Sequence, residues 1–177
     1  MEIRVDVANA EAISRAFLQA PAMVLDELEV TMKSVTGYLM RETQEVMLER
    51  KVVAAGTLRS GWTTQVDVIA SLDTVFGRVT NPLPYAIPVE LGTKPHFPPL
   101  EPLINWVEQK LWLYGDEAES RARAIQRSIG RRGTLGRGMA HTAFAQGQET
   151  IRDEFTECAQ RITARLAAAD GGAGAPA

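Results

Sequence analysis

The sequence predicts an α+β fold in which a small antiparallel β-sheet packs against a long amphipathic helix and a C-terminal helix. Apolar residues recur at spacings of three, four or seven over residues 22–50, and a second apolar stripe covers residues 140–168. Both patterns are typical of helices that bury one face. Between them, residues 62–69 and 74–80 are rich in β-formers and are joined by a Ser-Leu-Asp turn, which predicts a β-hairpin.

Two further segments are candidates for strands of the same sheet. Residues 2–7 alternate Ile3, Val5 and Val7 with charged residues, and this period of two predicts a short, half-buried strand. Residues 85–91 form either a third strand or a single helical turn. Because proline cannot donate to a β-ladder, Pro88 would confine a strand here to the edge of the sheet.

Shorter elements fill the space between the hairpin and the C-terminal helix. Apolar spacing predicts helices over residues 100–113 and 118–129, and residues 130–138 form a loop of glycine and arginine. The Gly/Ala-rich residues 169–177 have no apolar pattern and are expected to be a disordered tail. The chain length of 177 residues favours a single domain over residues 1–168.

Charge is distributed unevenly along the chain. The whole sequence has a net charge of −3, which argues against general coating of nucleic acid. Residues 119–138 nevertheless contain six arginines and one glutamate, a net charge of +5, whereas residues 1–50 contain five basic and nine acidic residues, a net charge of −4. The basic segment is either an electrostatic contact surface or a solvated helix end and loop.

The residues with chemical potential are few and scattered. His96, His141 and Cys158 lie far apart in sequence, without the paired spacings of a zinc site, and Cys158 lies on an apolar stripe, as expected for a buried thiol. Residues 130–138 lack the Gly-x-x-x-x-Gly-Lys pattern of a phosphate loop. We therefore expect no catalytic residue, metal site or cofactor, no enzymatic activity, and no contact with a membrane.

Two segments carry a resemblance to a known family. One is Gly56-Thr57-Leu58-Arg59-Ser60-Gly61-Trp62, between the long helix and the hairpin, and the other is Tyr85-Ala86-Ile87-Pro88-Val89-Glu90-Leu91-Gly92-Thr93, followed by a proline-rich turn. In this order they resemble the tail-component family of long-tailed bacteriophages. That family contains tail-completion (neck) proteins and the minor tail protein Z type of lambda-like phages. The resemblance covers residues 25–165.

The resemblance implies a structural virion protein at the head–tail junction or tail end, assembled in the bacterial cytoplasm. It implies a homo-oligomeric ring, six- or twelve-fold, that contacts neighbouring neck, tail-terminator or tail-tube proteins and lets DNA pass, with at most non-specific DNA contact. Gly92 is expected to have a positive φ, and Glu90 to accept hydrogen bonds from loop amides or from Arg59. The expected structural and interface residues are Gly56, Leu58, Arg59, Ser60, Tyr85, Ala86, Glu90, Gly92, Thr93, Arg131, Arg132 and Arg137.

Two other functions fit the sequence. The chain is either a cytosolic adaptor that binds one protein through its long helix, or a nucleic-acid-binding protein that uses residues 119–138. Assembly into a ring separates the phage protein from the adaptor. The glycines of residues 130–138 raise the entropic cost of ordering that loop, so we expect it to be mobile in the free subunit and to order on an acidic subunit or on DNA.

Overall fold

The computed structural model describes residue 18, residues 20–52 and residues 56–172. These residues form two compact units. The first contains the described residues up to Glu42, Thr63–Thr80, and those from Ala143 onward; the second contains Thr43–Trp62 and Asn81–Thr142. We describe each unit by itself, and the expectation of a single domain over residues 1–168 stays a prediction.

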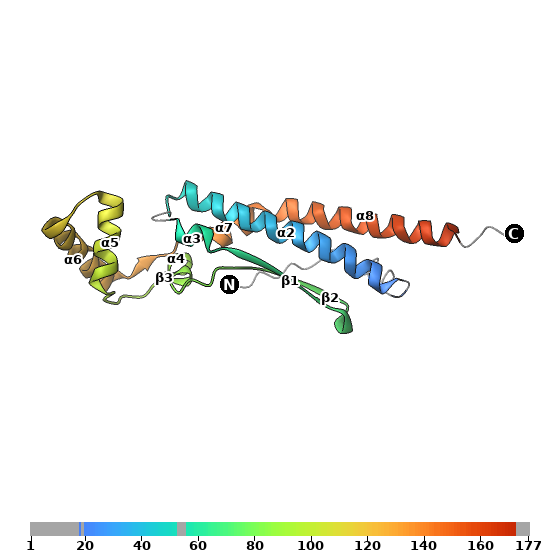
Figure 1. The fold of residues 1–177 in the computed structure, drawn as a ribbon, viewed down its shortest axis with the longest axis horizontal. Coiled ribbons are helices and arrows are strands. Elements are labelled where there is room, and N and C mark those ends of the chain that lie inside the picture. The colour runs from blue at the N-terminus through green and yellow to red at the C-terminus, as the bar shows by residue number, and fades with distance from the viewer. Residues whose placement is uncertain (1–17, 19, 53–55, 173–177) are drawn as a thin grey trace. The chain divides into compact units, whose positions relative to one another are not determined.

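The first unit is built on two long antiparallel helices. Figure 1 shows α2 (Pro21–Glu49) and α8 (Gln148–Gly172) running side by side in opposite directions. The apolar stripes expected from the sequence face inward, since the fully or nearly buried side chains include Val24, Leu28, Met32, Val35, Leu39, Ile151, Phe155, Cys158 and Ile162. The mixed α+β fold, with a long helix and a C-terminal helix, is therefore confirmed.

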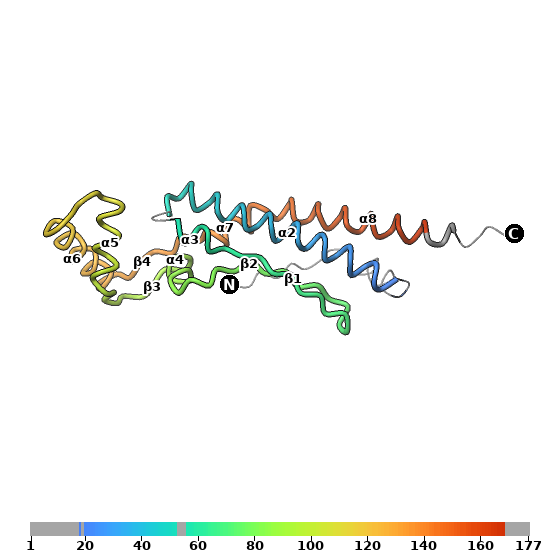
Figure 2. The backbone as a smooth tube through the Cα atoms, in the orientation of Figure 1, coloured from blue at the N-terminus to red at the C-terminus, as the bar shows by residue number. Residues whose placement is uncertain are grey.

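The predicted hairpin is present in the same unit. Strand β1 (Thr63–Ile69) pairs antiparallel with β2 (Thr74–Thr80), from Thr63 opposite Thr80 to Ile69 opposite Thr74. Figure 2 shows the backbones of the two strands running side by side. The turn between them is the short 3-10 helix η1 (Ala70–Leu72) and Asp73. A Cβ at Gly77 would lie 2.4 Å from the sulfur of Met32, so this glycine lets the hairpin approach α2 closely.

The second unit contains the shorter elements. It has the helices α3 (Thr57–Ser60), α4 (Ala86–Leu91), α5 (Leu100–Leu111) and α6 (Gly115–Arg132), and the paired two-residue strands β3 (Gly92–Thr93) and β4 (Thr134–Leu135). Helices α5 and α6 pack on a small core of Val107, Ala118 and Ala122, surrounded by Leu100, Leu103, Ile104, Leu113 and Ile125.

Of the two alternatives for residues 85–91, the helical turn is confirmed, because residues 86–91 form α4 with Pro88 in its first turn, where no backbone N–H is needed. Two other predicted segments differ from the structure. The predicted helix over residues 140–168 is two helices, α7 (Met139–Gln146) and α8, separated at Gly147. The predicted loop over residues 130–138 is also divided: α6 extends through Arg132 and β4 pairs with β3.

The chain ends are described only in part. The predicted strand over residues 2–7 lies outside the described residues, as do residues 173–177. Helix α8 continues to Gly172, four residues into the predicted tail, because the run Ala167-Ala168-Ala169 favours helix. In the described ranges, no helix is both long enough and apolar enough to cross a membrane.

Candidate functional site

The buried carboxylate of Glu90 fixes the start of helix α7. Its Oε2 accepts hydrogen bonds from the backbone N–H of Met139 at 2.8 Å and of Ala140 at 3.2 Å, and its Oε1 accepts one from His141 at 3.1 Å. The residue is only 5% exposed. The first N–H groups of a helix lack intrahelical partners and attract negative charge. Glu90 therefore accepts hydrogen bonds from backbone amides, as the sequence predicts, but these amides belong to the first turn of α7 instead of a loop. No contact of Glu90 with Arg59 is found among the described residues.

Gly92 allows two chain segments to approach each other. Its φ is 79° and its ψ is −178°, so the predicted positive φ is confirmed. A Cβ here would lie 2.4 Å from the carbonyl oxygen of Thr134 and 2.6 Å from the nitrogen of Gly136. The pairing of β3 with β4 is reinforced by Thr93, whose hydroxyl lies 3.0 Å from that of Thr134. Only glycine fits this crossing.

The first motif is held through its backbone carbonyls. Gly56 has a φ of 81°, and α3 follows it. The carbonyl oxygen of Leu58, a buried residue, accepts a hydrogen bond from Asn81 at 2.8 Å, and that of Arg59 accepts one from Gln44 at 3.1 Å. Ser60 donates to the Thr57 carbonyl at 3.2 Å. The motif therefore ties the end of α2 to the chain that follows the hairpin.

Arg131 and Arg132 lie in the last turn of α6, whereas three other predicted residues lie on or beside α4. Ala86 is buried, while Tyr85 is 44% exposed. Arg137 donates its backbone N–H to the carbonyl oxygen of Val89 at 2.8 Å, and its own carbonyl accepts a hydrogen bond from the Arg50 guanidinium. These contacts give the backbone of Arg137 partners within the unit, and the mobility of residues 130–138 in the free subunit stays a prediction.

Exposed apolar side chains on the second unit were not predicted from the sequence. Leu135 is 92% exposed, Leu91 is 72% exposed and Ile87 is 61% exposed. In the β3–β4 pair, Leu135 lies opposite Gly92. Because Gly92 directly follows Leu91, the backbones of Leu91 and Leu135 lie close together. Large exposed apolar side chains that gather in one place often mark a protein interface. The only signal in the sequence was a leucine inside a run of glycine and arginine.

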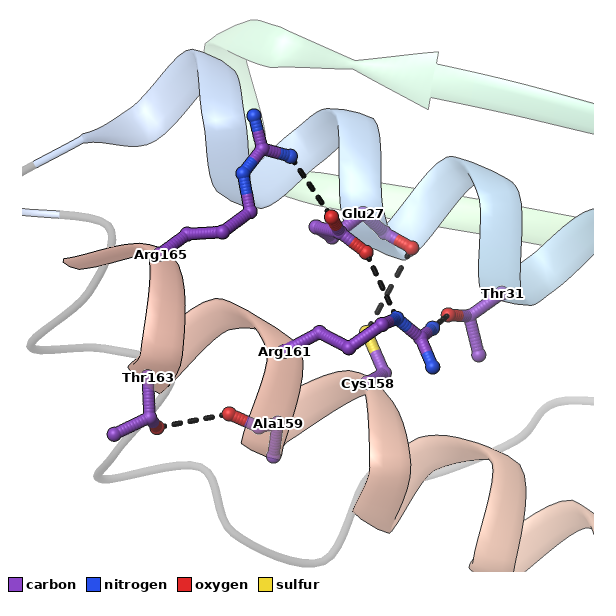
Figure 3. A network of polar contacts seen from close by, with 7 residues as sticks. All are labelled: Glu27, Thr31, Cys158, Ala159, Arg161, Thr163 and Arg165. Carbon is purple, nitrogen blue, oxygen red and sulfur yellow. Dashed lines mark hydrogen bonds and ion pairs between the residues drawn. The ribbon is translucent and has the colours of Figure 1, made fainter. Parts of the chain in front are cut away.

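A second polar cluster joins α2 to α8 in the first unit (Figure 3). Glu27 pairs with Arg161 at 3.1 Å and with Arg165 at 2.8 Å, and its side chain is only 14% exposed. The hydrogen bonds from these two arginines hold the pKa of Glu27 below its ordinary value. Arg161 also donates to the hydroxyl of Thr31 at 2.9 Å. Burial raises the pKa of the neighbouring Cys158 thiol, as expected for a structural cysteine.

We expect Glu27→Gln to lower the stability of the first unit at neutral pH but not in acid. A carboxylate with a lowered folded-state pKa stabilises the fold above its unfolded pKa and loses that contribution as the pH falls through the folded pKa. The difference in melting temperature between wild type and variant should therefore be full at pH 7. This difference should become smaller once the pH falls below 4.5, the ordinary pKa of a glutamate side chain. Because both arginines are half exposed, the effect at pH 7 should be about 1 kcal/mol. A difference that stays constant down to pH 2.5 would contradict this.

The described residues include no group of three or more His, Cys, Asp or Glu side chains that could hold a metal ion. His96 contacts the carbonyl of Lys94 at 3.0 Å, and His141 contributes its backbone N–H to the Glu90 site. Trp106 and Trp112 are 42% and 75% exposed, so neither side chain is buried in the second unit. Comparison with protein-family models, curated proteins and solved structures finds no match.

Proposed function

We propose that this chain is a structural virion protein of a long-tailed bacteriophage. In this proposal it forms a ring, six- or twelve-fold, at the head–tail junction or tail end. The ring completes the tail, joins it to the capsid through neighbouring neck or tail proteins, and leaves a lumen for DNA. Its subunits have no catalytic role, and assembly is the mechanism.

The observation that carries the proposal is the role of the two motifs on which the resemblance depends. Several of their polar groups join backbone segments: the carbonyls of Leu58 and Arg59 accept side-chain hydrogen bonds, and the Glu90 carboxylate caps α7. A catalytic site instead needs a nucleophile or base aimed at open space. Motifs whose polar groups make hydrogen bonds within the chain are expected in a structural protein that presents a fixed surface to its neighbours.

The surface presented by the second unit supports a subunit contact. Leu91 and Leu135 expose most of their side chains to solvent, although burying a leucine is worth about 1.5–3 kcal/mol. Contact with the next subunit of a ring would bury them. The backbone pairing of β3 with β4 sets the position of Leu135 relative to Gly92, and such ordering before association lowers the entropy lost on binding.

Leu135→Asp is expected to abolish ring formation without unfolding the subunit. The side chain is 92% exposed, so the folded monomer should change by no more than about 0.5 kcal/mol. In an assembled contact, however, the aspartate would bury an unpaired charge. Negative-stain microscopy and sedimentation at equal concentrations measure assembly, and Leu135→Met serves as the matched control that keeps the apolar contact.

Two results would contradict the proposal in different ways. If Leu135→Asp assembles like the wild type, Leu135 is not at the subunit contact. If the wild-type protein forms no ring, either alone or with isolated phage tails, the proposed function itself is wrong.

A further inference from the structure

We propose that the exposed arginine face of α6 binds the phosphate backbone of double-stranded DNA. The site is an open hollow of about 450 Å³ lined by Ala124, Arg127, Ser128, Arg131 and Arg132. The inference rests on the proposed function, because the DNA that passes through the ring would be the ligand.

The arginines form an unneutralised surface on one side of the helix. The opposite side of α6 buries Ala118 and Ala122. Of the arginines on the outer side, Arg123 pairs with Glu119, and Arg132 donates to the neutral hydroxyl of Ser128 at 2.8 Å. In the part of the chain that the structure describes, no carboxylate pairs with Arg121, Arg127 or Arg131. A solvated positive surface therefore remains for an outside anion.

The helix dipole accounts for only part of this charge. Cations in the last turn of a helix are favoured by the partial negative charge there, and the effect fades within that turn. Arg131 and Arg132 lie in the last turn of α6, so the helix dipole is sufficient to explain why arginines occur there. The dipole does not explain Arg121 and Arg127, which lie further toward the N-terminus on the exposed side of the helix.

The dimensions of the surface suit a nucleic-acid backbone. From Arg121 to Arg132 the helix rises about 16 Å, at roughly 1.5 Å per residue. Over that length, duplex DNA presents about ten phosphate charges, one for each ~1.7 Å of its axis. Several arginines of one subunit can therefore contact phosphates at the same time.

The composition of the hollow favours phosphate over protein as the ligand. The centre of a protein interface is typically apolar and aromatic, whereas this lining consists of three arginines, a serine and an alanine. Arginine and serine side chains are common donors to DNA phosphates, and such contacts carry no sequence information. The acidic character of the whole chain, with a net charge of −3, would confine DNA to this face.

The test measures binding of a fluorescent 30-base-pair duplex to the full chain by anisotropy, from 50 to 200 mM salt. If each subunit neutralises three to five phosphates, affinity should fall about 40- to 500-fold over this range. The triple variant Arg127→Gln, Arg131→Gln, Arg132→Gln should bind at least about tenfold more weakly at 50 mM salt, with a salt slope smaller by about 3. The triple Arg→Lys variant should keep most of the binding, because it keeps the charge.

The control removes three exposed charges elsewhere, with Arg41→Gln, Lys94→Gln and Arg152→Gln, and should bind DNA with nearly wild-type affinity and slope. Ring formation is measured on every variant by microscopy. The inference is overturned if wild type does not bind DNA at 50 mM salt, or if the triple Gln variant binds like wild type. It is also overturned if that variant folds but no longer forms rings, since α6 would then be a subunit interface and the proposed function would stand. DNA binding through these arginines without any ring would support the inference and refute the proposed function.

Discussion

Glu90→Ala is expected to destabilise the second unit by about 3–5 kcal/mol. The change leaves the backbone N–H groups of Met139, Ala140 and His141 without their acceptor, and each buried donor left unsatisfied costs about 1–3 kcal/mol. The negative charge that favours the N-terminus of α7 is lost as well. Helix α7 should lose its defined start, and with it the anchoring of residues 137 and 138.

Tryptophan fluorescence during urea unfolding measures the stability of the second unit. The chain has three tryptophans, at positions 62, 106 and 112, and all of them lie in the second unit. Glu45→Ala is the matched control, because Glu45 is an exposed glutamate in the part of α2 that belongs to the same unit. It should change stability by no more than about 0.5 kcal/mol. Equal midpoints for the two variants would show that the Glu90 contacts contribute nothing.

The local features of the Glu90 site could be predicted from the sequence, whereas its contacts between distant parts of the chain could not. The motif over residues 85–93 was enough to predict that Glu90 accepts hydrogen bonds and that Gly92 has a positive φ. The partners of Glu90 lie 49 to 51 residues further along the chain, and nothing in the local sequence identifies them. The β3–β4 pair, with two residues in each strand, is too short to produce a periodic pattern.

The other open or wrong points in the fold have similar causes. Residues 85–91 stayed open between a strand and a helical turn because Pro88 is compatible with both. Gly147 lies inside a continuous apolar stripe, which predicted one helix instead of two. A Cβ there would lie 2.7 Å from the ring of Tyr38, and this close approach depends on a residue more than a hundred positions away. The two long stripes and the hairpin, by contrast, are set by local periodicity and were predicted correctly.

Gly92→Val is expected to destabilise the second unit by at least about 3 kcal/mol and to prevent ring assembly. The backbone of Gly92, at φ 79° and ψ −178°, lies in a region that is essentially restricted to glycine, and a strained residue costs about 1–3 kcal/mol. Any side chain would also meet the carbonyl oxygen of Thr134 at 2.4 Å. That oxygen belongs to the backbone of β4, so it cannot move aside without breaking the β3–β4 pair.

Gly56→Val serves as the comparison for the collision at Gly92. Gly56 has a φ of 81° and a ψ of −15°, in the left-handed region, and no atom of the described residues lies within 4 Å of the position of its Cβ. The substitution should cost only about 1–2 kcal/mol, the ordinary penalty for a left-handed residue, and its product should still assemble. Fluorescence-detected urea unfolding gives both energies, and microscopy gives the assembly of each variant. Equal losses would show that the carbonyl oxygen of Thr134 moves aside and that the collision adds nothing to the backbone strain. A loss at Gly92 that exceeds the roughly 1–3 kcal/mol of backbone strain would show that the crossing of the two segments is fixed.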